Sequence, residues 1–113
     1  MDFDRFAVAL LVLRDDAPCL SEADAAKLQD AHMSHLADLH QLGHVLAAGP
    51  LMDGDYRGLM ILNADPEAAR ELMATDPAVR AGRLDVLVLP WMVPRGAMEF
   101  SLTKFPRSMA EVD

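Results

Sequence analysis

The segment "FAVALLVL", Phe6 to Leu13, decides how the rest of the chain is interpreted. It is rich in aliphatic and β-branched residues and ends at the turn-forming residues "DDAP", a pattern that predicts a β-strand. Its odd and even positions are both apolar, whereas a strand with one solvated face alternates apolar and polar residues. We therefore expect this strand to lie in the middle of a sheet that is covered on both faces.

The remaining predicted elements lie C-terminal to this strand. Ser21 with Asp24 forms a capping box, Gly43 marks a helix end, and Asp65 before Pro66 marks a helix start. The predicted elements are strands at 6–14, 44–49, 57–64 and 83–91, and helices at 22–42 and 66–74. The order β-α-β-β-α-β predicts an α+β protein with a ferredoxin-like fold and an antiparallel sheet.

The two strands expected at the centre of such a sheet are the first and the third. The third contains "LMIL", which is also apolar at odd and even positions. Because two helices can cover only one face of the sheet, the other face needs a partner, and a second copy of the same sheet is the simplest one. The sequence thus predicts a homodimer of the dimeric α/β barrel type.

Composition limits the classes of function. A chain of 113 residues fits one domain, for which we expect the bounds 1–92, with a C-terminal tail at 93–113 that packs on the dimer partner or at a pocket mouth. The net charge of −8 disfavours nucleic acid and anionic membrane surfaces as partners. The apolar runs are too short to span a bilayer, and the single cysteine, Cys19, forms no internal disulfide. We expect a cytoplasmic protein.

All four histidines fall between Ala31 and Pro50, in "AHMSHLADLHQLGHVLAAGP". On a helical wheel, Leu28, Leu36 and Leu39 lie within about 40° of His32, so His32 faces the sheet. We expect the other three histidines to be solvated or at an interface. Their spread disfavours a metal site, and no phosphate-binding glycine loop occurs, so neither a metal nor a cofactor is expected.

Four residues are candidates for a site that binds a small molecule, and each has a structural alternative. His32 is either an acid–base catalyst or a core histidine with a satisfied hydrogen bond. Asp76 either pairs with a catalytic histidine or caps the turn "PAVRAG". Trp91 either walls a pocket or covers the edge of the core. Arg14 either holds an anionic ligand or is a solvated charge at a strand end.

The motifs "HMSHLADLHQLGHVLAAGP" and "GLMILNADPEAARELMATDPAVRAGRLDVLVLPW" resemble the YciI-like, or YCII-related, family of ferredoxin-like proteins from about Phe6 to Trp91. This resemblance implies a histidine and an aspartate that act as a catalytic dyad in a pocket of a dimer. The matching positions are His32, eighteen residues before Pro50, and Asp76 in "TDPAV".

The resemblance favours a cofactor-independent enzyme of lyase or isomerase type that acts on a small ring or carbonyl compound. In this hypothesis His32 is the acid–base group and Asp76 fixes its tautomer. The alternative is a non-catalytic protein that binds a small ligand, or an accessory subunit, on the same dimeric scaffold.

Overall fold

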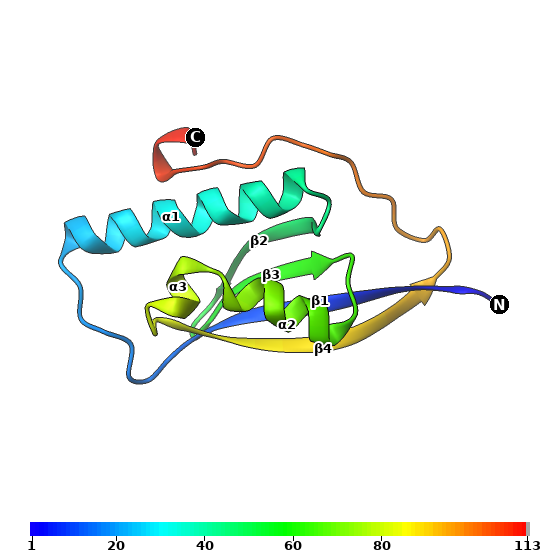
Figure 1. Ribbon diagram of the computed structural model, residues 1–113, viewed down its shortest axis with the longest axis horizontal. Coiled ribbons are helices and arrows are strands. Elements are labelled where there is room, and N and C mark those ends of the chain that lie inside the picture. Colours follow the sequence, from blue (N-terminus) through cyan, green and yellow to red (C-terminus); the bar gives the residue numbers. More distant parts are fainter. Residues whose placement is uncertain (113) are drawn as a thin grey trace.

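The computed structural model describes residues 1–112 of the chain (Figure 1). Its elements are β1 (Phe3–Leu13), α1 (Glu22–Gln41), β2 (Val45–Asp53), β3 (Tyr56–Leu62), α2 (Pro66–Ala74), α3 (Pro77–Arg80), β4 (Leu84–Pro94) and the short 3₁₀ helix η1 (Met109–Glu111). The predicted β-α-β-β-α-β order is confirmed. The segment after α2, expected from the sequence to be a capped turn, forms one short helix, α3.

The four strands form one antiparallel sheet in the order β2-β3-β1-β4. The fold is therefore α+β and ferredoxin-like, with β1 and β3 at the centre as predicted. Three strands are longer than expected: β1 begins at Phe3, β2 continues to Asp53, and β4 continues to Pro94, which pairs with Phe3. Pro50 lies within β2, an edge strand, where the missing N–H of proline is tolerated.

The helix ends follow the capping residues in the sequence. Ser21 Oγ accepts a hydrogen bond from the backbone N–H of Asp24 at 3.1 Å, which starts α1. Asp65 accepts one from the N–H of Ala68 at 2.8 Å, which starts α2. After α1, Gly43 has a φ of 85°, a conformation that glycine adopts without steric cost. These local signals explain why the predicted helix bounds agree closely with the observed ones.

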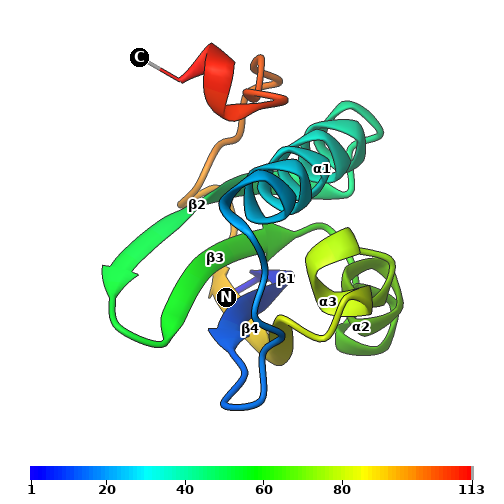
Figure 2. The ribbon, with the colours of Figure 1, turned by 90° about the vertical axis from the view of Figure 1, so that its left-hand side faces the viewer.

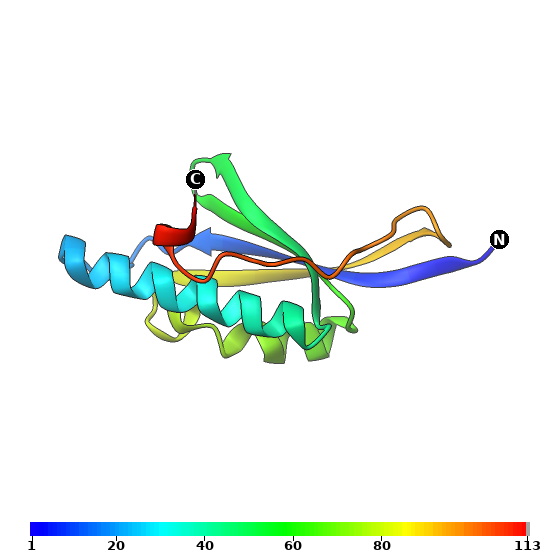
Figure 3. The ribbon, with the colours of Figure 1, turned by 90° about the horizontal axis from the view of Figure 1, so that it is seen from above.

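The α-helices lie on one side of the sheet (Figure 2, Figure 3). On that side, alternate residues of β1 such as Ala7, Ala9 and Leu11 are buried in the hydrophobic core. The opposite, open face carries the residues in between, and there Leu87 and Leu89 are each 45% exposed and Trp91 is 37% exposed. Large apolar side chains on a sheet face without helices are consistent with a covering partner.

After β4 the chain turns back and lies along α1 of the same molecule (Figure 1, Figure 3). Arg107 pairs with Asp38 at 2.8 Å, and the N–H of Met109 donates to Asp30 at 2.9 Å. The tail thus covers its own domain in the single chain. Packing of residues 93–113 on a partner subunit stays a prediction.

Within residues 1–112, none of the helices combines the length and the apolar character that crossing a membrane requires. The location of the chain in the cell stays a prediction from the sequence.

Candidate active site

His32 and Asp76, 44 positions apart in the sequence, meet at the centre of the candidate site. His32 Nδ1 lies 2.6 Å from Asp76 Oδ2. His32 comes from the middle of α1, and Asp76 is the N-cap residue of α3, which packs against α1. The apolar stripe of α1 turns His32 toward the sheet, as the helical wheel predicted. The structure therefore brings together the two residues that the sequence analysis proposed as a dyad.

The carboxylate of Asp76 is fully buried and held at both oxygens. Oδ1 accepts a hydrogen bond from the backbone N–H of Ala78 at 2.8 Å, and Oδ2 faces His32. Asp76 therefore caps α3 and orients His32 at once. Because a carboxylate can only accept, the neutral ring of His32 carries its proton on Nδ1 and has an unprotonated Nε2.

A cavity of about 590 Å³ lies beside this pair, between α1, the helix side of the sheet and the C-terminal tail. His32 lines it, although only 12% of the His32 side chain is exposed. The rest of the wall is largely apolar, with Leu11, Met33, Leu36 and Met60 among its members. A cavity of this size, mostly apolar with a few polar groups, is typical of small-molecule sites. Nε2 of His32 is the nitrogen that remains for a molecule bound there.

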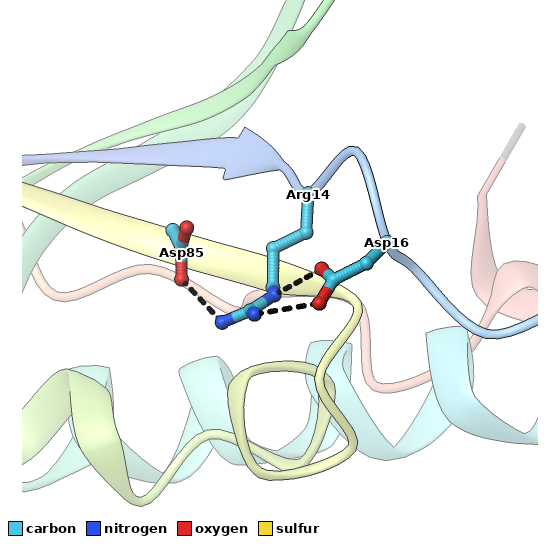
Figure 4. A network of polar contacts seen from close by, with 3 residues as sticks. All are labelled: Arg14, Asp16 and Asp85. Atoms are coloured by element: carbon cyan, nitrogen blue, oxygen red, sulfur yellow. Dashed lines mark hydrogen bonds and ion pairs between the residues drawn. The ribbon is translucent and has the colours of Figure 1, made fainter.

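Arg14 and Trp91, the two predicted ligand-binding residues, do not line this cavity. The Arg14 guanidinium donates to Asp16 at 2.8 Å and to Asp85 at 3.0 Å at one end of the sheet (Figure 4). The hydrogen bond from Arg14 lowers the pKa of the exposed Asp16 carboxyl, and the bond to Asp16 raises the pKa of Arg14. Trp91 lies on the open face of the sheet, beside Phe6, with ring centroids 6.4 Å apart.

The prediction that the other histidines are solvated or at an interface is wrong for His40. This residue is 3% exposed, and its Nδ1 donates to the carbonyl of Val45 at 2.7 Å. Its Nε2 accepts from the N–H of Thr103 at 3.0 Å, and its ring stacks on Phe105 with centroids 3.8 Å apart. The helical wheel places His40 off the apolar stripe, but the C-terminal tail covers it there.

Several residues that line the cavity were not predicted from the sequence. Arg57 and Arg83 do so from the starts of β3 and β4, and Phe105, Pro106 and Met109 do so from the tail. No local pattern marks the two arginines, because their relation to His32 depends on strand pairing. The tail was expected on the dimer partner or at a pocket mouth, but its cavity-lining residues could not be assigned, because their sequence has no clear period.

Among residues 1–112, no group of three or more histidine, cysteine, aspartate or glutamate side chains is arranged to hold a metal ion. His35, one helical turn from His32, instead has its Nε2 3.0 Å from the hydroxyl of Thr75. The candidate site consists of the His32–Asp76 pair and the cavity that His32 lines.

Comparison with known proteins points to one family. A family model described as YCII-related domain matches residues 8–92. Among curated proteins, no sequence matches the chain. A solved structure with the same fold is the 5-chloro-2-hydroxyhydroquinone dehydrochlorinase from Burkholderia phenoliruptrix, in complex with 2,5-dihydroxybenzoquinone. It aligns with a TM-score of 0.57 and 17% identity over 76% of this chain and 92% of that one.

Proposed function

The chain belongs to the YCII-related domain family, and from that premise we propose that it is a cofactor-independent acid–base enzyme of lyase or isomerase type. Its substrate is a small ring or carbonyl compound, His32 is the acid–base residue, and Asp76 is the positioning residue. The observation that carries the proposal is the 2.6 Å contact between His32 Nδ1 and the fully buried Asp76 carboxylate, beside a cavity that His32 lines.

The dyad suits the removal of a proton from carbon or oxygen. Nε2 of His32 takes the proton, and the electron pair left behind forms a new double bond. In an elimination, the leaving group departs with the electron pair of the bond that breaks, and His32 then releases its proton to solvent. In an isomerisation, His32 returns the proton to another atom of the substrate. Asp76 stabilises the imidazolium that forms and holds the ring so that Nε2 faces the substrate.

The fold comparison supports the same class of reaction. The dehydrochlorinase with the same fold is, by its name, an enzyme that removes a chlorine substituent from a hydroxylated ring. At 17% identity this likeness by itself shows only the fold. The proposal therefore rests on the dyad of this chain, and the comparison guides the choice of compounds to test.

The test follows proton abstraction and elimination directly. A panel of γ-lactones, cyclic enones and chlorinated hydroxyhydroquinones is incubated with the protein in D₂O, while deuterium incorporation and chloride release are measured. We expect the wild type to accelerate at least one reaction, and His32→Gln to slow it by about 10²–10⁴-fold. His35→Gln, the same change one turn away on α1, is the matched control and should leave the rate within about two-fold.

The alternative function is binding without catalysis, which the apolar cavity also supports. A compound that raises the melting temperature of the protein, while no compound of the panel undergoes exchange or elimination, would favour the binding function and overturn the proposed enzyme. Accelerated rates that are equal for the wild type and His32→Gln would instead overturn the catalytic role of His32.

We further propose that two copies pack through the open face of the sheet, as the apolar character of both central strands predicts. Leu87, Leu89 and Trp91 supply exposed apolar area on this face, and a specific dimer buries roughly 1,000 Å² or more in total. Sedimentation at micromolar concentration should give a dimer, and Leu89→Asp should give a monomer. A monomeric wild type would contradict this arrangement.

A further inference from the structure

The charge of the cavity is opposite to that of the chain as a whole. Acidic residues outnumber basic ones by 18 to 10 in the sequence, and the net charge is −8. Among the described residues that line the cavity, however, the charged side chains are Arg57 and Arg83, and no aspartate or glutamate is present. The other polar side chains on the wall are those of Gln29 and His32. Positive charge is thus concentrated at the site of an acidic protein.

The two arginines lie at the same end of the sheet. Gly58, next to Arg57, pairs with Leu11 of β1, and Leu84, next to Arg83, pairs with Leu13 of the same strand. The arginines therefore flank the C-terminal end of β1 from its two neighbouring strands. Within the part of the chain that the structure describes, neither forms an ion pair, whereas Arg14 is bonded to two carboxylates.

Arg83 is tied to the dyad through the backbone of α3. Its N–H donates to the carbonyl of Ala78 at 3.1 Å, and the N–H of Ala78 donates to Asp76 Oδ1 at 2.8 Å. The carbonyl of Arg83 also accepts from the N–H of Arg14 at 3.0 Å, which anchors the start of β4. The backbone from which the Arg83 side chain extends is thus fixed relative to His32 and Asp76.

From this arrangement we propose that the cavity selects anionic ligands: small planar ring compounds with a carboxylate or an ionised hydroxyl group, held by Arg57 and Arg83. A guanidinium donates two parallel hydrogen bonds to such oxygens, which a neutral compound accepts less strongly. The apolar wall takes the ring. The proposal rests on the function proposed above, because removal of a proton by His32 creates negative charge that the same arginines stabilise.

The test is calorimetric titration of the full chain with three pairs of probes, each an anion and a neutral analogue built on the same ring. The pairs are benzoate and benzamide, salicylate and salicylamide, and 2,5-dihydroxybenzoquinone and 2,5-dimethoxybenzoquinone. The first two pairs test a carboxylate and the third tests ionised hydroxyl groups. We expect at least one anion to bind about ten-fold or more tightly than its analogue, because hydrogen bonds to charged groups are the stronger ones.

Arg57→Gln and Arg83→Gln should each weaken binding of the preferred anion by about ten-fold and leave its neutral analogue unchanged. Arg80→Gln, an exposed arginine of α3 that does not line the cavity, is the matched control and should have no effect. Arg83→Lys keeps the charge and should retain part of the preference, which separates loss of charge from disturbance of the fold.

Equal affinities within all three pairs, no binding of any anion, or an anion preference that both glutamine variants retain would overturn the proposal. The deuterium-exchange assay described above distinguishes failure of the anion-site proposal from failure of the proposed enzymatic function. Anion binding that depends on the arginines, without turnover, would refute only the enzyme; turnover restricted to neutral compounds would refute only the anion site.

Discussion

Two histidines of α1, eight residues apart, differ in what their ring nitrogens contact: His40, which is buried, and His32, which is partly buried. Both nitrogens of His40 are bonded to backbone groups, Val45 O and Thr103 N, and Phe105 covers its ring. His32 has one nitrogen on the buried carboxylate of Asp76, and its ring borders a cavity. His40 is the satisfied core histidine that the sequence analysis considered for His32. What the second ring nitrogen contacts therefore separates a structural histidine from a candidate catalyst.

The largest expected effect is on stability at His40. His40→Ala removes two hydrogen bonds and a stacked ring, and it leaves buried backbone groups unpaired, so the free energy of unfolding should fall by about 2–4 kcal/mol. His32→Ala should cost less, about 1–2 kcal/mol, because water from the cavity can solvate the Asp76 carboxylate. Urea unfolding at pH 7 measures both. A greater loss of unfolding free energy for His32→Ala than for His40→Ala would contradict the assignment of His40 as the structural histidine.

A second prediction concerns the negative charge of Asp76, because the backbone groups that contact His40 are uncharged. Asp76→Asn keeps the size of the side chain and an acceptor for the N–H of Ala78, but it removes the negative charge that favours the imidazolium. The exchange or elimination rate should fall by about 10²-fold, which corresponds to about 2.7 kcal/mol in transition-state stabilisation. Asp65→Asn, at the cap of α2, is the control and should leave the rate unchanged. An unaltered rate in Asp76→Asn would show that the carboxylate is only a helix cap.

A third prediction concerns the tail that covers His40. Phe105→Ala removes the stacked ring, and because Phe105 is only partly buried, the loss of stability should be about 1–2 kcal/mol. The tail should also become more sensitive to limited proteolysis. Leu102→Ala, at a side chain that is 67% exposed, should change neither property. Tail cleavage at the wild-type rate in Phe105→Ala would mean that this stacking does not hold the segment in place.

The smallest expected effect is at Arg14, which forms ion pairs away from the cavity (Figure 4). Arg14 lowers the pKa of Asp16, so this pair stabilises the fold above the unfolded-state pKa of Asp16 and loses that contribution as the pH falls through the folded-state value. Arg14→Gln should raise the Asp16 pKa toward its ordinary value, as measured by NMR titration, without changing ligand affinity. Loss of anion binding in Arg14→Gln would instead support the ligand-binding role that the sequence allowed for Arg14.

The fold could be predicted because its signals are local. Ser21, Gly43 and Asp65 mark helix ends through their own caps, and the two-sided apolar character of the central strands marks their place in the sheet. The contact between His32 and Asp76 was within reach because a helical wheel turns His32 toward the core, and the family resemblance supplied its partner.

The rest of the site depends on contacts between distant segments. Arg57 and Arg83 line one cavity only because β3 and β4 flank β1, and the burial of His40 depends on a tail more than sixty residues later in the chain. Arg14 looked available for a ligand because the sequence does not reveal that Asp85 lies opposite it across two paired strands. A sequence pattern describes one helix or strand at a time, whereas each of these contacts joins two segments that are distant in the sequence.

The most direct test of the central claim is side-chain ¹⁵N NMR of the histidines during titration with salicylate. We expect neutral His32 and His40 both to carry their proton on Nδ1. The ligand should shift the Nε2 resonance of His32, and both nitrogen resonances of His40 should stay unchanged. A proton on Nε2 of neutral His32, or a shift at His40 while His32 is unaffected, would contradict the division of these two histidines into a catalytic and a structural residue.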